Sequence, residues 1–97
     1  MRVRYTPRAR ADLKEIDAYL RTRSLQGARN VRDRVRQAAR NLGDMPGSGR
    51  ESDFPGIRIA PLVTYPYIIY FRIRDNEVHI VHVRHGARQQ PAAGDLM

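Results

Sequence analysis

The spacing of apolar residues changes once along this chain, from the period of a helix in the first half to the period of a strand in the second. In the first half, two stretches carry apolar residues at intervals of four, three and four: Ala9, Leu13, Ile16 and Leu20, and then Val31, Val35, Ala38 and Leu42. This spacing predicts amphipathic helices over 7–23 and 28–42. β-Branched and aromatic residues then alternate or run together over 57–85, which predicts an antiparallel meander of strands.

Capping residues predict where the two helices begin and end. Thr6 followed by Pro7 is typical of a helix start, because threonine caps free amide groups and proline fits the first turn. Gly27 is expected to separate the two helices, and Gly43 to cap the end of the second. Two helices with so short a joint are expected to form an antiparallel hairpin.

Three shorter stretches complete the predicted architecture. Residues 2–5 alternate and predict an edge strand, whereas 44–56 hold two prolines and three glycines without a period and predict a connecting loop. Residues 89–97 are expected to form a loose tail. With 97 residues the chain is expected to be one domain. We therefore predict an α+β fold, with an N-terminal edge strand and an antiparallel helix hairpin packed on a small antiparallel β-sheet.

The positive charge is concentrated in the predicted helices. The chain holds 18 Lys and Arg against 10 Asp and Glu, a formal net charge of +8. Residues 1–50 contain 13 cations and 5 anions, whereas 51–97 contain 5 of each, so the first half carries the whole excess. Such a surface attracts nucleic acids and acidic proteins alike, and a solvated arginine face is an equally open interpretation.

Residue types that are absent exclude several classes of function. Cysteine is absent, which excludes a disulfide scaffold, a thiolate metal site and a cysteine nucleophile. No apolar run approaches the ~18 residues of a membrane span, and we expect a cytoplasmic protein without membrane contact. His82 has the opposite strand parity to His79 and His85, so we expect no metal site, and we expect no cofactor.

Three stretches, in this order and spacing, resemble the RelE/ParE superfamily of bacterial toxins from toxin–antitoxin operons. They are Tyr5-Thr6-Pro7-Arg8-Ala9; Pro46-Gly47-Ser48-Gly49-Arg50 with Gly56-Ile57-Arg58; and Tyr65-Pro66-Tyr67-Ile68-Ile69-Tyr70-Phe71-Arg72-Ile73 with Val83-Arg84-His85-Gly86-Ala87-Arg88. The resemblance covers about residues 3–88. The motifs at 65–67 and 85–88 resemble the ParE branch in particular. Gln89-Gln90-Pro91 departs from that branch, in which an acidic residue often follows the arginine.

The resemblance implies a ParE-like toxin that inhibits DNA gyrase and blocks replication without catalysis of its own. It also implies a ParD-like antitoxin with a ribbon-helix-helix DNA-binding part and an acidic C-terminal arm, so that operator DNA is reached only through the antitoxin. The candidate contacts with the target are Arg58, Arg72, Arg84 and Arg88. The candidate antitoxin site is the apolar surface of the helix hairpin, made of Leu13, Ile16, Tyr19, Leu20, Val31 and Val35.

Two other functions stay open at this point. A RelE-like, ribosome-dependent mRNA endonuclease would have to draw its acid, base and phosphate clamp from Arg58, Arg72, His85 and Arg88. Arginine is a poor proton carrier because its pKa is above 12, and no tyrosine follows Tyr70, which RelE-type nucleases usually have near the C-terminus. A non-toxic co-repressor that acts only together with its antitoxin is the other alternative.

Overall fold

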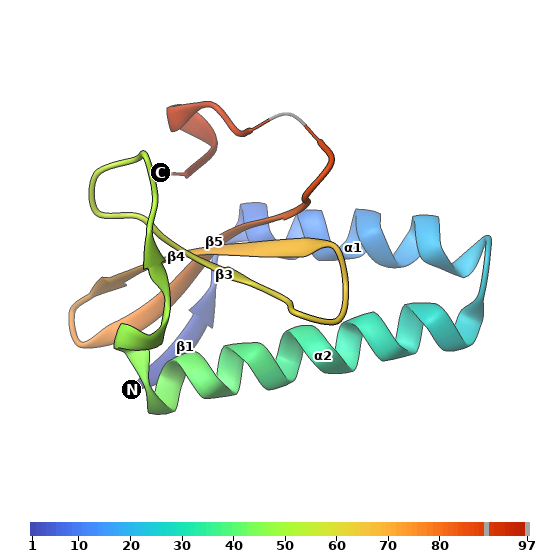
Figure 1. Ribbon diagram of the computed structural model, residues 1–97, viewed down its shortest axis with the longest axis horizontal. Helices are drawn as coiled ribbons and strands as arrows, with labels where there is room; N and C mark the ends of the chain where they lie inside the picture. Colours follow the sequence, from blue (N-terminus) through green and yellow to red (C-terminus); the bar gives the residue numbers. More distant parts are fainter. Residues whose placement is uncertain (89, 97) are drawn as a thin grey trace.

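The computed structural model describes residues 1–88 and 90–96 of the chain. Its elements, in order, are β1 (Arg2–Tyr5), α1 (Pro7–Arg21), α2 (Leu25–Asp44), the 3-10 helix η1 (Pro46–Ser48), β2 (Arg50–Glu51), β3 (Arg58–Pro61), β4 (Tyr67–Arg74), β5 (Glu77–His85) and the 3-10 helix η2 (Ala93–Leu96). The two helices run side by side along one side of the sheet (Figure 1). The predicted α+β layer pair is therefore confirmed.

The helix starts follow from side-chain caps. The Thr6 hydroxyl accepts a hydrogen bond from the amide of Ala9 at 3.2 Å, as the Thr-Pro pattern predicts. Ser24 caps α2 in the same way, by accepting from the amide of Gly27 at 2.9 Å. Gly27 therefore lies in the first turn of α2 and does not separate the helices. The prediction for its start was wrong because the serine cap lies three residues before the glycine.

Gly43 also lies inside α2, which ends at Asp44, so its predicted role as a helix cap was wrong. Its place in the fold is set by a long-range contact with the N-terminus. The amino group of Met1 donates to the carbonyl oxygen of Gly43 at 2.7 Å. A Cβ at position 43 would lie only 2.8 Å from the carbonyl oxygen of Met1, so this approach needs glycine.

The sheet has five strands in the order β1-β5-β4-β3-β2. The pairs from β2 to β5 are antiparallel, whereas β1 runs parallel to β5, with Tyr5 opposite Ile80. The sheet is therefore mixed. The helix hairpin carries the chain from β1 at one edge of the sheet to β2 at the other, and the antiparallel strands then run back to β5, beside β1. The two-residue strand β2 lies inside the predicted loop 44–56, and two residues are too few to show a period.

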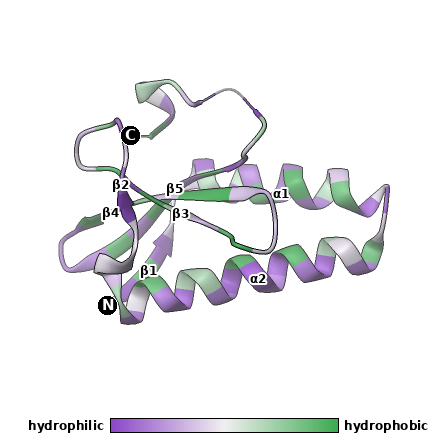
Figure 2. Ribbon diagram, in the orientation of Figure 1, coloured by the Kyte–Doolittle hydropathy of each residue, from purple (hydrophilic) through white to green (hydrophobic). Residues whose placement is uncertain are grey.

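Both faces of the sheet are covered. The larger core packs between the sheet and the helices, and it includes Phe71, Ile69 and Ile80, all 0% exposed. Figure 2 shows hydrophobic colour gathered on the central strands. A second, smaller cluster of buried side chains includes Tyr70 and Leu96.

The C-terminal segment differs from the prediction of a loose tail. Ala93–Leu96 forms a short 3-10 helix, and the side chain of Leu96 is only 2% exposed. Leu96 packs with Ile57, Tyr70 and Val81. The ends of the predicted tail, at 89 and 97, lie outside the described residues. A single apolar anchor in a polar segment shows no period, so the sequence could not indicate where it packs.

Gly49 lies at a point of close packing between η1 and the sheet. A Cβ at this position would lie 2.5 Å from Cζ of the buried Phe71 ring, whereas one at Gly47 would meet nothing within 4 Å. Gly49→Ala should therefore lower the free energy of unfolding by about 1–3 kcal/mol through overpacking. Urea unfolding measures this, with Gly47→Ala as the matched control. An equal loss in both variants would contradict this account.

No helix in the part of the chain that the structure describes combines the length and the apolar character needed to cross a membrane.

Candidate functional site

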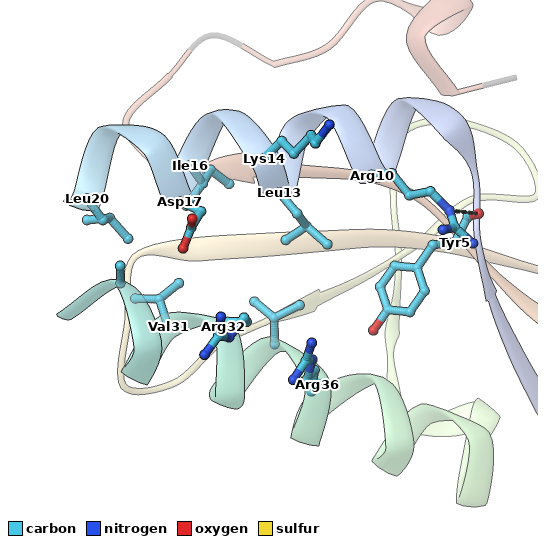
Figure 3. Close-up of a pocket in the computed structure, with 12 residues that line it drawn as sticks. Tyr5, Arg10, Leu13, Lys14, Ile16, Asp17, Leu20, Val31, Arg32 and Arg36 are labelled. Atoms are coloured by element: carbon cyan, nitrogen blue, oxygen red, sulfur yellow. Dashed lines mark hydrogen bonds between the residues drawn. The ribbon is translucent and has the colours of Figure 1, made fainter. Parts of the chain in front are cut away.

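A groove with a volume of about 440 Å³ lies between the facing sides of α1 and α2 (Figure 3). We call it the hairpin groove. Its apolar lining comes from β1 and both helices: Tyr5, Leu13, Ile16, Leu20, Ala28, Val31 and Val35. Five of the six residues predicted as the antitoxin site therefore meet in one hollow. They meet because residues at intervals of three and four lie on one face of each helix.

The rim of the hairpin groove is positively charged. Its lining includes Arg10 and Lys14 from α1 and Arg32 and Arg36 from α2. None of these four cations forms an ion pair within residues 1–88 and 90–96. The one carboxylate in the lining, that of Asp17, is occupied by the guanidinium of Arg21 at 2.6 Å. The hollow therefore suits an apolar side chain whose flanks carry negative charge.

The apolar residues that line the hairpin groove differ in how deeply they are buried. Val31 and Val35 are 6% and 2% exposed, so they form the floor and belong to the main core. Leu13, Ile16 and Leu20 are half-buried and form the accessible wall. These three side chains are the ones that a docked partner would contact.

Tyr19 lies outside the hairpin groove. Its neighbour Leu20 lines the groove, whereas Tyr19 does not. The Tyr19 ring is 51% exposed, and the guanidinium carbon of Arg23 lies 4.8 Å from its centroid. Tyr19 instead lines a second hollow, which it shares with Ile16, Leu20 and Val31.

A second hollow, of about 930 Å³, lies between α1, the start of β4, the end of β5 and the C-terminal segment. Its lining includes Tyr19, Tyr65, Tyr67, His82, His85 and Arg88. The opposite strand parity of His82 and His85 predicts opposite faces, yet both line this hollow. The reason is that it wraps round the edge of β5, since the consecutive residues Arg84 and His85 line it too.

A buried acid–histidine pair lies against this hollow. Oδ2 of Asp12 lies 2.6 Å from Nδ1 of His82 and accepts from the amide of Val83 at 3.1 Å. Nε of Arg8 donates to Oδ1 at 3.0 Å. Burial by itself would raise the pKa of Asp12, but the hydrogen bonds from His82, Val83 and Arg8 together lower it below its usual value. The carboxylate is thus ionised at neutral pH, and Nδ1 of His82 must carry the donated proton.

Asp12 lies in the first half of α1, where a carboxylate is compatible with the helix dipole, but the structure gives it another role. The first turn of α1 contains no acidic residue, and Asp12 is 8% exposed. A signal for its burial was present, because Asp12 follows Ala9 by three residues and precedes Ile16 by four. It therefore lies on the same face of the helix as those two apolar residues.

Two ion pairs join α1 to the C-terminal segment. Nη1 of Arg8 lies 3.1 Å from Oδ1 of Asp95, so Arg8 bridges Asp95 and Asp12. Nη1 of Arg88 lies 3.7 Å from Oε1 of Glu15, and both of these side chains are well exposed. Both pairs are exposed to solvent, the second more than the first, so each contributes little to stability.

Two of the four predicted target arginines serve the fold itself. Arg58 donates to the carbonyl oxygens of Gly47 and Gly49, so it holds the η1 loop. Arg84 donates to the hydroxyl of Tyr70 at 2.8 Å and to the carbonyl oxygen of Arg88 at 2.9 Å. Both guanidinium groups donate to backbone or side-chain oxygens that the sequence pattern could not identify, although Nε of Arg58 is buried without a partner among the residues that the structure describes.

The candidates for a nuclease site are not gathered in one place. In the ladder of β4 and β5, Arg72 lies opposite His79 and Tyr67 lies opposite His85. Arg72 and His85 are therefore separated by five residues along the strands, which is about 16 Å. His85 accepts from the amide of Ala87 at 3.0 Å, and its ring meets the Tyr67 ring edge-on at 5.3 Å.

The three histidines of β5 have separate partners. Nε2 of His79 lies 3.3 Å from Oε1 of Glu77, and His82 and His85 make the contacts described above. Within residues 1–88 and 90–96, no three or more His, Cys, Asp or Glu side chains are grouped as a metal site requires.

Known proteins resemble this chain over nearly its whole length. The family model for the ParE toxin of type II toxin–antitoxin system, parDE, matches residues 3–90. The chain is 37% identical to the predicted toxin Y4kP of Sinorhizobium fredii, over 93% of each chain. It is 36% identical to Toxin RelE2 of Caulobacter vibrioides, over 87% of this chain and 93% of the relative.

The fold is similar to that of a chain in the solved structure of the chromosomal ParDE TA system from P. aeruginosa. The TM-score is 0.78 at 27% identity, with 88% of this chain and 95% of the other covered. Sequence motifs, fold and relatives agree, and the chain belongs to the ParE family of toxins of type II toxin–antitoxin systems.

Proposed function

We propose that this toxin inhibits DNA gyrase and that a ParD-like antitoxin neutralises it. The separation of the basic residues carries the first part of the proposal. A ribonuclease needs an acid, a base and a phosphate clamp around one phosphate, whereas Arg72 and His85 are about 16 Å apart along the strands. A toxin that acts by binding needs no such set. The similarity to a chain of a ParDE system supports the same branch.

The hairpin groove supports the second part of the proposal. Its apolar wall of Leu13, Ile16 and Leu20 fits one face of a helix, and its unpaired basic rim attracts acidic side chains on the flanks of that helix. The antitoxin thus places its acidic C-terminal arm in this groove. Its ribbon-helix-helix part recognises the operator, which the toxin reaches through the antitoxin.

The target contact is assigned by elimination among the four arginines. The guanidinium groups of Arg58 and Arg84 donate hydrogen bonds to oxygens within the fold. Arg84 donates to the carbonyl oxygen of Arg88 and so holds the turn that carries it. Arg88 is well exposed, and Arg72 is half-buried on the strand β4. We therefore assign contact with gyrase to Arg88 and Arg72.

Pulse labelling after induction of the toxin alone tests this function. Thymidine incorporation should stop before methionine incorporation, because a gyrase poison blocks replication first. In a purified system, negative supercoiling by gyrase should decrease as toxin is added. Heat-denatured toxin is the control in the second assay.

The alternatives give different results in the same two assays. An early stop of methionine incorporation, with gyrase unaffected, would indicate the mRNA endonuclease and contradict the proposal. Normal growth after induction, with the folded toxin present and gyrase unaffected, would indicate the co-repressor and contradict it as well.

A further inference from the structure

Four arginines form a straight line along α2. Arg29, Arg32, Arg36 and Arg40 follow at intervals of three, four and four residues, and all four side chains are exposed. At 1.5 Å per residue the line is about 16 Å long. We call it the arginine line.

The arginine line has no partner that would explain it within the fold. In residues 1–88 and 90–96, none of the four guanidinium groups forms an ion pair. Asp33, the one carboxylate between positions 29 and 40, forms no ion pair there either. Arg40 donates to the side-chain oxygen of Gln37 at 2.9 Å, which leaves its charge uncompensated.

The hairpin groove accounts for only half of this charge. Arg32 and Arg36 line its rim, whereas Arg29 and Arg40 line neither the groove nor the second hollow. An acidic arm in the groove would therefore lie beside the middle of the arginine line and leave its two ends free. Four like charges held 4–6 Å apart along the axis repel each other. A bound partner with a continuous negative charge would offset this repulsion.

We propose that the arginine line binds the phosphate backbone of duplex DNA independently of sequence. B-DNA carries one negative charge per about 1.7 Å of its axis, so a line of about 16 Å faces phosphates along its whole length. Guanidinium groups bind phosphate oxygens through two parallel hydrogen bonds, which favours arginine at such a surface. The inference concerns the toxin alone and does not depend on its action on gyrase.

Salt dependence of binding measures the number of phosphates contacted. The full chain is titrated against a fluorescently labelled 20-base-pair duplex, with the binding constant measured by anisotropy at several salt concentrations. Four contacts should give a slope of about −3.6 in a plot of log K against log salt concentration. The double variant Arg29→Gln/Arg40→Gln should give about −1.8, and about 50-fold weaker binding at 0.1 M salt.

A control variant with the same net charge separates the arginine line from the charge of the whole molecule. Arg2 and Arg74 are exposed and lie on the strands β1 and β4. Arg2→Gln/Arg74→Gln should keep a slope near −3.6. Circular dichroism confirms that both double variants are folded.

Three results would overturn the proposal. The first is equal slopes for the two double variants, which would mean that only net charge matters. The second is the absence of salt-dependent binding in the unaltered toxin. The third is that a polyglutamate of matched charge displaces the toxin as readily as unlabelled duplex does, which would indicate an acidic protein as the partner.

Discussion

Replacing Asp12 by alanine should lower the free energy of unfolding by about 3 kcal/mol at pH 7. The change leaves two buried donors without an acceptor, the Nδ1 proton of His82 and the amide of Val83. It also releases Arg8, which bridges Asp12 and Asp95. Urea unfolding followed by circular dichroism measures the loss.

Glu15→Ala is the matched control for this prediction. Glu15 lies on the same helix and pairs with Arg88 at 3.7 Å, but both side chains are well exposed. Its loss should change the free energy of unfolding by less than about 1 kcal/mol. If the two variants lose equal stability, the buried pair does not have the role assigned to it.

The same pair predicts how stability depends on pH. Despite its burial, hydrogen bonds from His82, Val83 and Arg8 lower the pKa of Asp12 in the folded chain below its ordinary value of 3.8. The ionised carboxylate therefore stabilises the fold above about pH 4, and this contribution is lost as the pH falls through the lowered folded-state pKa. As the pH falls from about 5 through this lowered pKa, the unaltered chain should lose more stability than Asp12→Ala. Parallel acid profiles would contradict this assignment.

Leu20→Glu should weaken the complex with the antitoxin by at least about 100-fold, or about 2.7 kcal/mol. Leu20 lies in the accessible wall of the hairpin groove, so a carboxylate there would meet the apolar face of the docked arm. It would also repel the acidic flanks of that arm. Calorimetric titration of the folded variant with the cognate antitoxin measures the change.

Leu25→Glu makes the same chemical change outside the hairpin groove. Leu25 is 46% exposed at the start of α2 and does not line the groove. Its variant should bind the antitoxin within about threefold of the unaltered toxin, as rim substitutions usually do. Equal weakening by both variants would indicate a general charge effect, and no weakening by either would exclude the groove as the docking site. Thermal melts identify any variant that is unfolded.

The candidate site was predictable where its members lie on one helix face. Leu13, Ile16 and Leu20 recur at a helical spacing, and that spacing alone places them on one side of α1. The pairing of α1 with α2 followed from the short joint between them. Tyr19 was grouped with these residues because it is apolar and near in sequence, and the structure places it outside the hairpin groove but beside Ile16 and Leu20 in the second hollow.

The hydrogen-bond partners of the predicted target arginines could not be predicted from the sequence pattern. Alternation predicts which strand residues share a face, but it does not indicate which guanidinium groups find acceptors within the fold. Arg58 reaches the loop at 47–49, and Arg84 reaches a tyrosine on the neighbouring strand. Both acceptors depend on how loops close over the sheet, so only the structure could separate these arginines from Arg88.

The sequence by itself determined the two helices, the antiparallel meander, the apolar faces of each and the family. These properties depend on neighbours within one or two turns, and periodicity and capping express them directly. Only the tertiary structure decided the parallel pairing of β1 with β5, the burial of Leu96 and the contact of Asp12 with His82, 70 residues away. Such contacts arise when the chain closes on itself, and their free energy depends on burial and on partners that no local pattern contains.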